Sequence, residues 1–474
     1  MPAHRRVAGW AITVALMTVL GSNVTRPSVA AAGSPYPRSI SQTAASGTPS
    51  AACPPVLNGD GTVTFHWCLP GATSVSVVGE WVGPIGTGTL TLSLDAATGL
   101  WSGTMALPND LYSYTFTVSG SAGLVDPSNP PWDAEGLQSQ VFVPGSNSPA
   151  NPAENYGWLS PDTAVPHGSL HKHFITTPLS VGAYANGNHP LAVYTPPGYD
   201  PGCSRLYPTL YLQHGGGGND VDWTTQGYAG IIEDNLLAEG LAQPMVIVMA
   251  NFNNTARDPV TTREEDGFRE DLLSAYIPFA ETNYCVLKQR AGRAYAGLSQ
   301  GGAYGQNIIE NSADQFAYFG IWSPACIDTV HPDCGRSPTV AELSTPGPKS
   351  ITRVHFGSGV NDFFGAEVTV STEQANLAAS MIPNRLHMTP IEDSPAIPVT
   401  DPGPSPNVGY ERQTDHTWNS WREQLRDALT TTFFQPPPAT SIPDAPAPAW
   451  LLAVAGAVAA AAGLRAGRRT RHRR

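Results

Sequence analysis

The stretch that most constrains the fold of this chain is Gly297-Leu298-Ser299-Gln300-Gly301. It has the pattern G-x-S-x-G, in which a strand turns sharply into a helix and a serine stands at the strained apex. Glycine is needed on both sides because a Cβ atom there would clash with the neighbouring chain. A β-prone run, 293–296, precedes the motif, and a helix-compatible run, 303–310, follows it. We therefore predict an elbow with Ser299 as nucleophile; the alternative, in a chain with 47 glycines, is a chance turn.

A second glycine-rich stretch, His214 to Gly218, follows an apolar run at 209–213 that predicts a buried strand. A phosphate-binding loop would need a following Gly-Lys-Ser/Thr, which the chain lacks. Consecutive glycines let backbone N–H groups approach a developing negative oxygen without obstruction by side chains. We predict an oxyanion hole made by the amides of Gly215, Gly216 and Gln300, with a plain flexible loop as the alternative.

The serine needs an acidic partner, and Asp362 stands where one is expected. It comes just past a predicted strand, where the carboxylate of a catalytic triad belongs. Glu367 is the nearest rival, and Asp362 could instead cap a helix or a turn. Glu392 and Asp393 fit less well, because they open a Pro-rich insertion rather than follow a strand.

His416 is the predicted base. It stands in a loop before a helix expected at 421–429. With Ser299 and Asp362 it gives the chain order Ser, Asp, His, which is the order of α/β-hydrolases and differs from those of chymotrypsin and subtilisin. The histidine would take the proton of the serine, and the aspartate would orient the imidazole. A surface position is the alternative for any one of the 12 histidines.

Strand and helix patterns alternate around these motifs. This alternation predicts a mostly parallel sheet, whose site lies beyond the carboxyl ends of the strands. Strands are expected at 191–194, 209–213, 245–249 and 293–296, and helices at 231–239 and 271–284.

Residues 53–145 have another pattern, in which short runs of alternating apolar residues are separated by turns. The spacing predicts a small β-sandwich. The expected strand faces are Val63, Phe65 and Trp67; Leu90, Leu92 and Leu94; and Tyr112, Tyr114, Phe116 and Val118.

The N-terminal end predicts export. Residues 1–30 have a basic start, an apolar run at 7–20 and a cleavage site of small residues, and therefore predict a secretory signal. Residues 31–52, rich in Ser, Ala and Pro, predict a flexible leader. Export lets the six cysteines form disulfides. Closeness in sequence favours the pairs Cys53–Cys68 and Cys326–Cys334, which leaves Cys203 with Cys285, and sequence does not prove this pairing.

The C-terminal end predicts an anchor. A Pro-rich linker at 435–449 leads to an apolar segment at 450–464 and a basic tail at 465–474. The segment is short, because a spanning helix usually has ~20 apolar residues. The arginines that follow favour the cytoplasmic side of a membrane. We expect tethering to the membrane or cell wall, and a soluble amphipathic helix is the alternative.

Charge excludes one class of partner. The net charge is −13, and lysine occurs only at positions 172, 288 and 349, so we expect no binding of nucleic acid. No C-x-x-C motif is present, and we expect no metal and no cofactor.

Several of these motifs together resemble a family of esterases in the α/β-hydrolase superfamily. The family contains feruloyl and acetyl-xylan esterases, enterochelin esterases, S-formylglutathione hydrolases of the esterase D type, and mycolyltransferases. The matching segments are 166–168, 194–199, 214–219, 297–302 and His416-Thr417-Trp418-x-x-Trp421. The resemblance implies an α/β-hydrolase fold at 165–434 and the triad Ser299, Asp362 and His416. Gln300 departs from the family, many of whose members have methionine there.

The N-terminal segment resembles an early-set immunoglobulin-like module in its runs 65–81, 100–103 and 111–114. Such modules often precede secreted esterases, joined here by a linker at 146–164. Trp81, Trp101 and Trp132 are candidates for stacking on sugar rings, with packing in the core as the alternative.

These inferences together predict a secreted, surface-tethered serine carboxylic-ester hydrolase. Its substrate would be a small-molecule or polysaccharide-linked ester, such as a feruloyl, acetyl or siderophore ester. One alternative is an acyltransferase of the mycolyltransferase type, in which an alcohol rather than water accepts the acyl group. The other is a non-catalytic glycan-binding surface protein.

Overall fold

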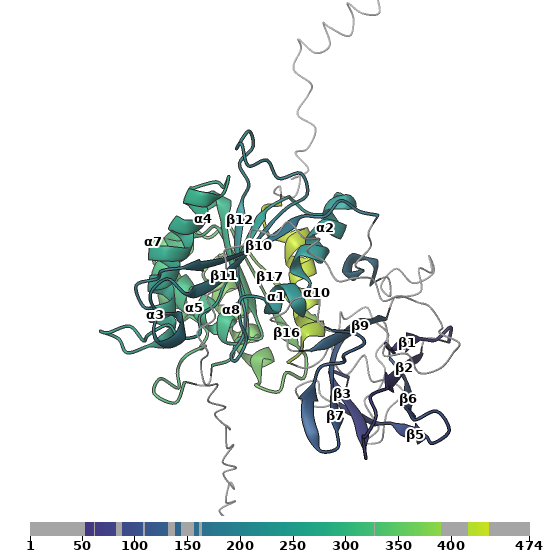
Figure 1. Cartoon of the computed structure of the whole chain (residues 1–474). Helices are drawn as coiled ribbons and strands as arrows, with labels where there is room; N and C mark the ends of the chain where they lie inside the picture. Colours follow the sequence, from purple (N-terminus) through teal and green to yellow (C-terminus); the bar gives the residue numbers. More distant parts are fainter. Residues whose placement is uncertain are drawn as a thin grey trace, which may run out of the picture. The chain divides into compact units, whose positions relative to one another are not determined.

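The computed structural model describes residues 53–60, 62–81, 88–107, 110–130, 138–143, 156–160, 164–326, 328–389 and 416–435 (Figure 1). The predicted signal, leader, Pro-rich insertion, apolar segment and basic tail lie outside the described residues, as does Trp132. No helix among the residues of those ranges is long and apolar enough to cross a membrane.

The segment before residue 144 forms two antiparallel sheets. The first has the order β1-β2-β6-β5, and the second has the order β4-β3-β7-β8, with β9 also paired to β7. The strands are β1 (Val56–Leu57), β2 (Thr62–Trp67), β3 (Val75–Gly79), β4 (Gly88–Thr91), β5 (Ser93–Asp95), β6 (Leu100–Ala106), β7 (Asp110–Val118), β8 (Ser121–Leu124) and β9 (Ser139–Val143).

Aromatic side chains from both sheets fill one core between them. On β2 the buried residues alternate with half-buried ones, as the period of a strand requires. Phe65 of β2 lies 5.0 Å from Tyr114 of β7 and 5.5 Å from Trp81, measured between ring centroids. Trp81 is only 1% exposed, so it packs in the core. The β-sandwich is thus present, and its likeness to an early-set module stays a prediction.

One predicted strand of this segment is wrong. Leu90, Leu92 and Leu94 do not share a strand face, because the chain leaves one sheet for the other between β4 and β5. β4 pairs with β3 and β5 pairs with β6. Leu92, at the crossing, is buried, whereas Leu94 is 48% exposed. Alternation along the sequence does not reveal such a change of sheet, because it continues through the bend.

The α/β part contains an eight-stranded sheet in the order β10-β11-β13-β12-β14-β15-β16-β17. β11 runs antiparallel to its neighbours β10 and β13, and all the later pairs are parallel, so the prediction of a mostly parallel sheet is confirmed. The strands are β10 (Ser169–Ile175), β11 (His189–Thr195), β12 (Thr209–Gln213), β13 (Val246–Ala250), β14 (Arg293–Leu298), β15 (Tyr318–Trp322), β16 (Arg353–Gly359) and β17 (Asn384–Thr389).

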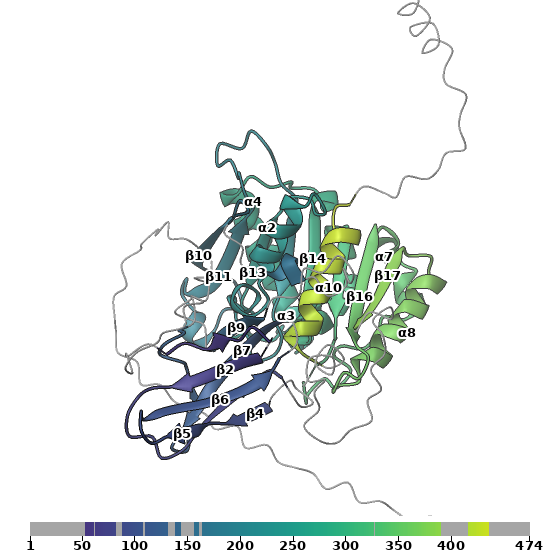
Figure 2. The same ribbon diagram turned by 90° about the vertical axis from the view of Figure 1, so that its right-hand side faces the viewer.

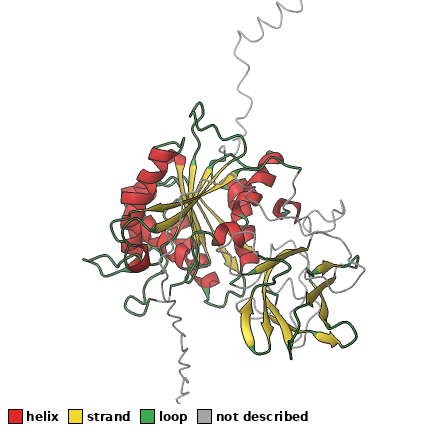
Figure 3. Cartoon of the chain, in the orientation of Figure 1, coloured by secondary structure: helices red, strands yellow, loops and turns green. Residues whose placement is uncertain are grey.

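Helices cover both faces of this sheet (Figure 3). α2 and α10 lie on one face of the sheet, and α3, α4, α5 and α8 lie on the other (Figures 1 and 2). The buried side chains of the two sets of helices accordingly belong to two separate hydrophobic clusters. The helices are α1 (Asp222–Thr225), α2 (Ala229–Ala238), α3 (Glu264–Asp271), α4 (Ile277–Asn283), α5 (Gln300–Ser312), α6 (Val340–Leu343), α7 (Pro346–Lys349), α8 (Ala366–Ala379) and α10 (Trp418–Thr431).

The helix predicted at 271–284 begins earlier than expected. It starts at Glu264 as α3 and continues through a π-helical segment, Leu272–Tyr276, into α4. The first turn of α3 carries three acidic residues, which stabilise a helix N-terminus but carry no apolar periodicity. The prediction relied on that periodicity and therefore missed the turn.

All three predicted disulfides are present. Cys53 is bonded to Cys68, Cys203 to Cys285, and Cys326 to Cys334. The last bond closes a short loop that follows β15, at the same end of the sheet as Ser299.

Candidate active site

Ser299 occupies a sharp turn between β14 and α5. Its backbone has φ 51° and ψ −119°, a conformation that a residue with a side chain rarely adopts. The flanking glycines make the turn sterically feasible. A Cβ atom on Gly297 would lie 2.5 Å from the backbone of Gly301, and one on Gly301 would lie 2.4 Å from the carbonyl oxygen of His214. The predicted elbow therefore exists, with Ser299 at its apex.

His416 and Asp362 are paired although 54 residues separate them. Asp362 follows β16 and His416 precedes α10, so both stand at the carboxyl-terminal side of the sheet. The imidazole Nδ1 lies 2.9 Å and 3.0 Å from the two carboxylate oxygens. Since a carboxylate only accepts, Nδ1–H donates this bond, and in the neutral imidazole this tautomer leaves the lone pair on Nε2. The rings of Phe364 and Trp421 lie against the imidazole, at centroid distances of 4.7 Å and 4.9 Å.

Ser299 and His416 line the same cavity, which has a volume of about 270 Å³. Gly215, Gly216 and Gln300 line it as well, so five of the six predicted site residues meet there, and Asp362 supports the histidine from behind. The walls are largely apolar, and Leu298, Phe364, Trp418 and Trp421 contribute to them.

The glycine-rich loop lies directly against Ser299. A Cβ atom on Gly215 would lie 2.7 Å from the Leu298 side chain and 3.0 Å from Cβ of Ser299. Gly217 has φ +76°, which favours glycine. These positions let the backbone of the loop approach Ser299, as the predicted oxyanion hole requires.

His214, at the start of this loop, holds it in place. Its Nδ1–H donates to the carbonyl oxygen of Gly215 at 2.7 Å, and its Nε2 accepts from the N–H of Phe252 at 3.3 Å. The ring also stacks on Phe252, with centroids 3.9 Å apart. Burial lowers the pKa of His214 to about 4, so the imidazole stays neutral. Sequence reasoning gave this histidine no role of its own.

Asp222, which the sequence analysis also missed, is the second carboxyl of the site. It lines the cavity and accepts the N–H of Asn219 at 3.1 Å. Burial raises its pKa to about 7. The pattern Asn-Asp-Val-Asp directly after the glycines was the available signal, but the pattern does not say which acid faces the cavity.

Glu367, the nearest rival acid, does not take the place of Asp362. Glu367 belongs to the first turn of α8 and does not line the cavity. Glu392 and Asp393 lie outside the described residues. Within the described ranges, no group of three His, Cys, Asp or Glu side chains is arranged to hold a metal ion.

A family model described as "Putative esterase" matches residues 182–432. The curated proteins include an endo-1,4-beta-xylanase/feruloyl esterase of Xylanibacter ruminicola, 31% identical over 279 residues. That match covers 57% of this chain but only 36% of the relative's length.

Two solved structures are among those to which this chain is similar, both at low identity. A ferulic acid esterase of Anaeromyces mucronatus is 19% identical with a TM-score of 0.45, over 59% of this chain and 95% of its own. The enterochelin esterase of Shigella flexneri is 15% identical with a TM-score of 0.49, over 78% of this chain and 91% of its own. At this distance neither structure bears on the substrate.

Proposed function

The chain belongs to the Esterase family, and we propose that it hydrolyses carboxylic esters with Ser299, His416 and Asp362 as its catalytic triad. One observation carries the proposal. A serine at a strained strand-to-helix turn shares a small cavity with a histidine whose other nitrogen is bonded to a buried carboxylate.

The reaction starts when Nε2 of His416 takes the proton of Ser299 and the serine oxygen attacks the ester carbonyl carbon. The negative charge develops on the carbonyl oxygen, where backbone N–H groups of Gln300 and of the loop at Gly215 and Gly216 stabilise it. The imidazolium then protonates the leaving alcohol, and an acyl-enzyme remains. Water, activated by the same histidine, releases the acid and restores the serine.

The lining of the cavity favours an ester with an aromatic group. Phe364, Trp418 and Trp421 present aromatic rings, which bind planar aromatic groups well. We therefore propose esters of aromatic acids, free or linked to a polysaccharide, as the substrate class. The name of the Xylanibacter ruminicola relative, which combines a xylanase with a feruloyl esterase, agrees with this choice.

The nucleophile is tested by Ser299→Ala and by a fluorophosphonate probe. We expect stoichiometric labelling of Ser299, and a loss of ester turnover by several orders of magnitude in a variant that keeps its circular dichroism spectrum and melting temperature. Labelling of a different serine would refute the assignment.

The substrate class is tested with a panel of p-nitrophenyl and hydroxycinnamoyl esters, with and without acceptor alcohols. We expect aromatic acyl esters to have the highest kcat/KM and added alcohols to change the product only slightly. Predominant transfer to the alcohol would identify an acyltransferase, and no turnover of any ester would favour the non-catalytic alternative.

We also propose that the protein is exported and held at the cell surface, on the basis of the signal and tail patterns in the sequence. The intact chain should fractionate with membrane or wall, whereas a form ending near Pro437 should be released and stay active. Equal release of both forms would contradict anchoring.

A further inference from the structure

Gln300 brings a polar side chain into the largely apolar cavity. It is the first residue of α5, and its amide group lies beside the glycine-rich loop. A Cβ atom on Gly216 would lie 2.8 Å from Oε1 of Gln300, so Gly216 leaves the room that this amide occupies.

The amide is held in one orientation. Nε2 of Gln300 donates to the Tyr304 hydroxyl at 2.6 Å and to a carboxylate oxygen of Glu264 at 3.3 Å. A carboxylate only accepts, so the NH₂ group must face Glu264 and the carbonyl oxygen must face the glycine loop. Burial raises the pKa of the Tyr304 phenol, which keeps this partner a neutral hydroxyl.

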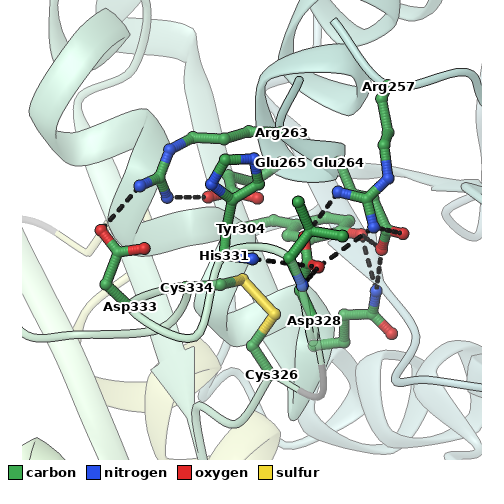
Figure 4. Close-up of a disulfide and its surroundings, with 12 residues drawn as sticks. Arg257, Arg263, Glu264, Glu265, Tyr304, Cys326, Asp328, His331, Asp333 and Cys334 are labelled. Atoms are coloured by element: carbon green, nitrogen blue, oxygen red, sulfur yellow. Dashed lines mark hydrogen bonds and ion pairs between the residues drawn. A yellow bond between two sulfur atoms is a disulfide. The ribbon is translucent and has the colours of Figure 1, made fainter. Parts of the chain in front are cut away.

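Glu264 is itself held by Arg257, which also binds a disulfide-closed loop (Figure 4). Arg257 donates to Glu264 at 2.6 Å and to both carboxylate oxygens of Asp328 at 2.7 Å and 3.1 Å. Asp328 belongs to the loop that the Cys326–Cys334 bond closes, and Arg257 lowers its pKa to about 2. A chain of contacts therefore runs from this loop through Arg257 and Glu264 to Gln300.

We propose that Gln300 is a specificity-determining residue whose carbonyl oxygen accepts a hydrogen bond from a hydroxyl group of the substrate. No described residue donates to Oε1, whereas Nε2 has two acceptors. The other polar side chains of the cavity already have roles. Ser299 and His416 react, and Asp222 binds the backbone of the glycine-rich loop at Asn219. An ester without the hydroxyl group would leave this acceptor unpaired in an apolar site, which disfavours its binding and reaction.

This inference rests on the proposed esterase activity. The hydroxyl group can belong to the acyl part of the ester or to the alcohol part, for example a sugar, and the test separates the two sources. The first substrate pair consists of two esters of one alcohol whose acyl groups differ by one hydroxyl. The second pair has one acyl group on two alcohols that differ by one hydroxyl.

The measured quantity is the ratio of kcat/KM within each pair, for the wild type and for Gln300→Met, which keeps the length and loses the amide. We expect a wild-type preference of about tenfold or more for the hydroxylated member of at least one pair, since 1.4 kcal/mol is a factor of ten. In the variant the ratio should approach one. The pair that shows this loss identifies the source of the hydroxyl.

Two variants of the disulfide-closed loop provide the matched comparison. Asp328→Asn should reduce the same ratio, because it weakens the contact chain to Gln300. Asp333→Asn should leave it unchanged, because Asp333 pairs with the guanidinium of Arg263, which binds Glu265 rather than Glu264 or Gln300. A wild type with no preference in either pair, or a Gln300→Met variant that keeps it, would overturn the inference. Absence of any ester hydrolysis would instead refute the proposed function, and this inference with it.

Discussion

At the scale of single residues, Ser299 adopts an unfavourable backbone conformation. Ser299 stands at φ 51°, and strained backbone of this kind costs of order 1–3 kcal/mol. The surrounding contacts maintain it: the N–H of Ser299 donates to Trp322 at 2.9 Å, and its carbonyl oxygen accepts from Ala303 at 2.9 Å and from Ala325 at 3.2 Å. The side chain is thus held at the cavity before any substrate arrives.

The first prediction concerns Asp362, the acid of the proposed triad. Asp362→Asn should lower kcat by about 10⁴, because an amide can donate to Nδ1 and so stabilise the wrong tautomer of His416. The measurement is steady-state kinetics on the best ester of the panel. Glu367→Gln is the control and should stay within about twofold of wild type, since Glu367 does not line the cavity. The opposite ranking would move the role to Glu367.

At the scale of elements, α5 and α8 meet through a buried polar pair. Nε2 of Gln306, on α5, donates to Glu373, on α8, at 2.8 Å, and both side chains are 0–1% exposed. Burial raises the pKa of Glu373 to about 7. Between about pH 4.5 and pH 7, Glu373 is therefore protonated in the folded state. In the unfolded chain, where its pKa is near 4.5, it has already released this proton.

The second prediction follows from this difference in proton binding. Between about pH 4.5 and 7 the native state holds more protons at Glu373 than the unfolded state, so this residue makes stability fall as pH rises through that window. Glu373→Gln should abolish this contribution and increase the free energy of unfolding at pH 8 by up to about 3 kcal/mol. Urea unfolding of wild type and variant at pH 4.5 and pH 8 measures both the pH dependence of stability and the gain at pH 8. Equal pH dependence of variant and wild type would contradict a protonated Glu373.

At the scale of the whole molecule, a buried ion pair connects the β-sandwich to the α/β part. Arg422, on α10, is 0% exposed and donates to a carboxylate oxygen of Asp110 at 3.0 Å and to the carbonyl oxygen of Leu111 at 2.8 Å, both on β7. Its other terminal nitrogen donates to Gln226, just after α1, at 2.7 Å. One side chain therefore connects the sandwich with α10, which follows His416, and with α1, which follows the glycine loop.

The third prediction tests this connection. Asp110→Asn should lower the free energy of unfolding by about 3–5 kcal/mol, because it leaves a buried guanidinium without its counter-charge. Adding Arg422→Met should recover part of that loss, so the two changes should be far from additive in urea unfolding. Arg426→Met on the same helix, a partly exposed position paired with Glu423, should cost only about 1 kcal/mol. Simple additivity would show that the pair does not act as a unit.

The sequence by itself determined the features that depend on a few consecutive residues. The elbow at Ser299 and the loop at Gly215 and Gly216 follow from backbone angles and from the space that a Cβ atom needs, and both are local properties. The alternation of strands and helices predicted the parallel sheet for the same reason. Neighbouring cysteines predicted two disulfides, and the third followed because only two cysteines remained.

Only the tertiary structure decided which distant side chains meet. Sequence order left Glu367 as a rival of Asp362, and the register of β16 and the start of α10 placed Asp362 against His416. The same packing brought Asp328 to Arg257, 71 residues away, and thereby fixed the amide of Gln300. Such pairs depend on how sheets and helices pack, and packing is a property of the whole chain that no short stretch encodes.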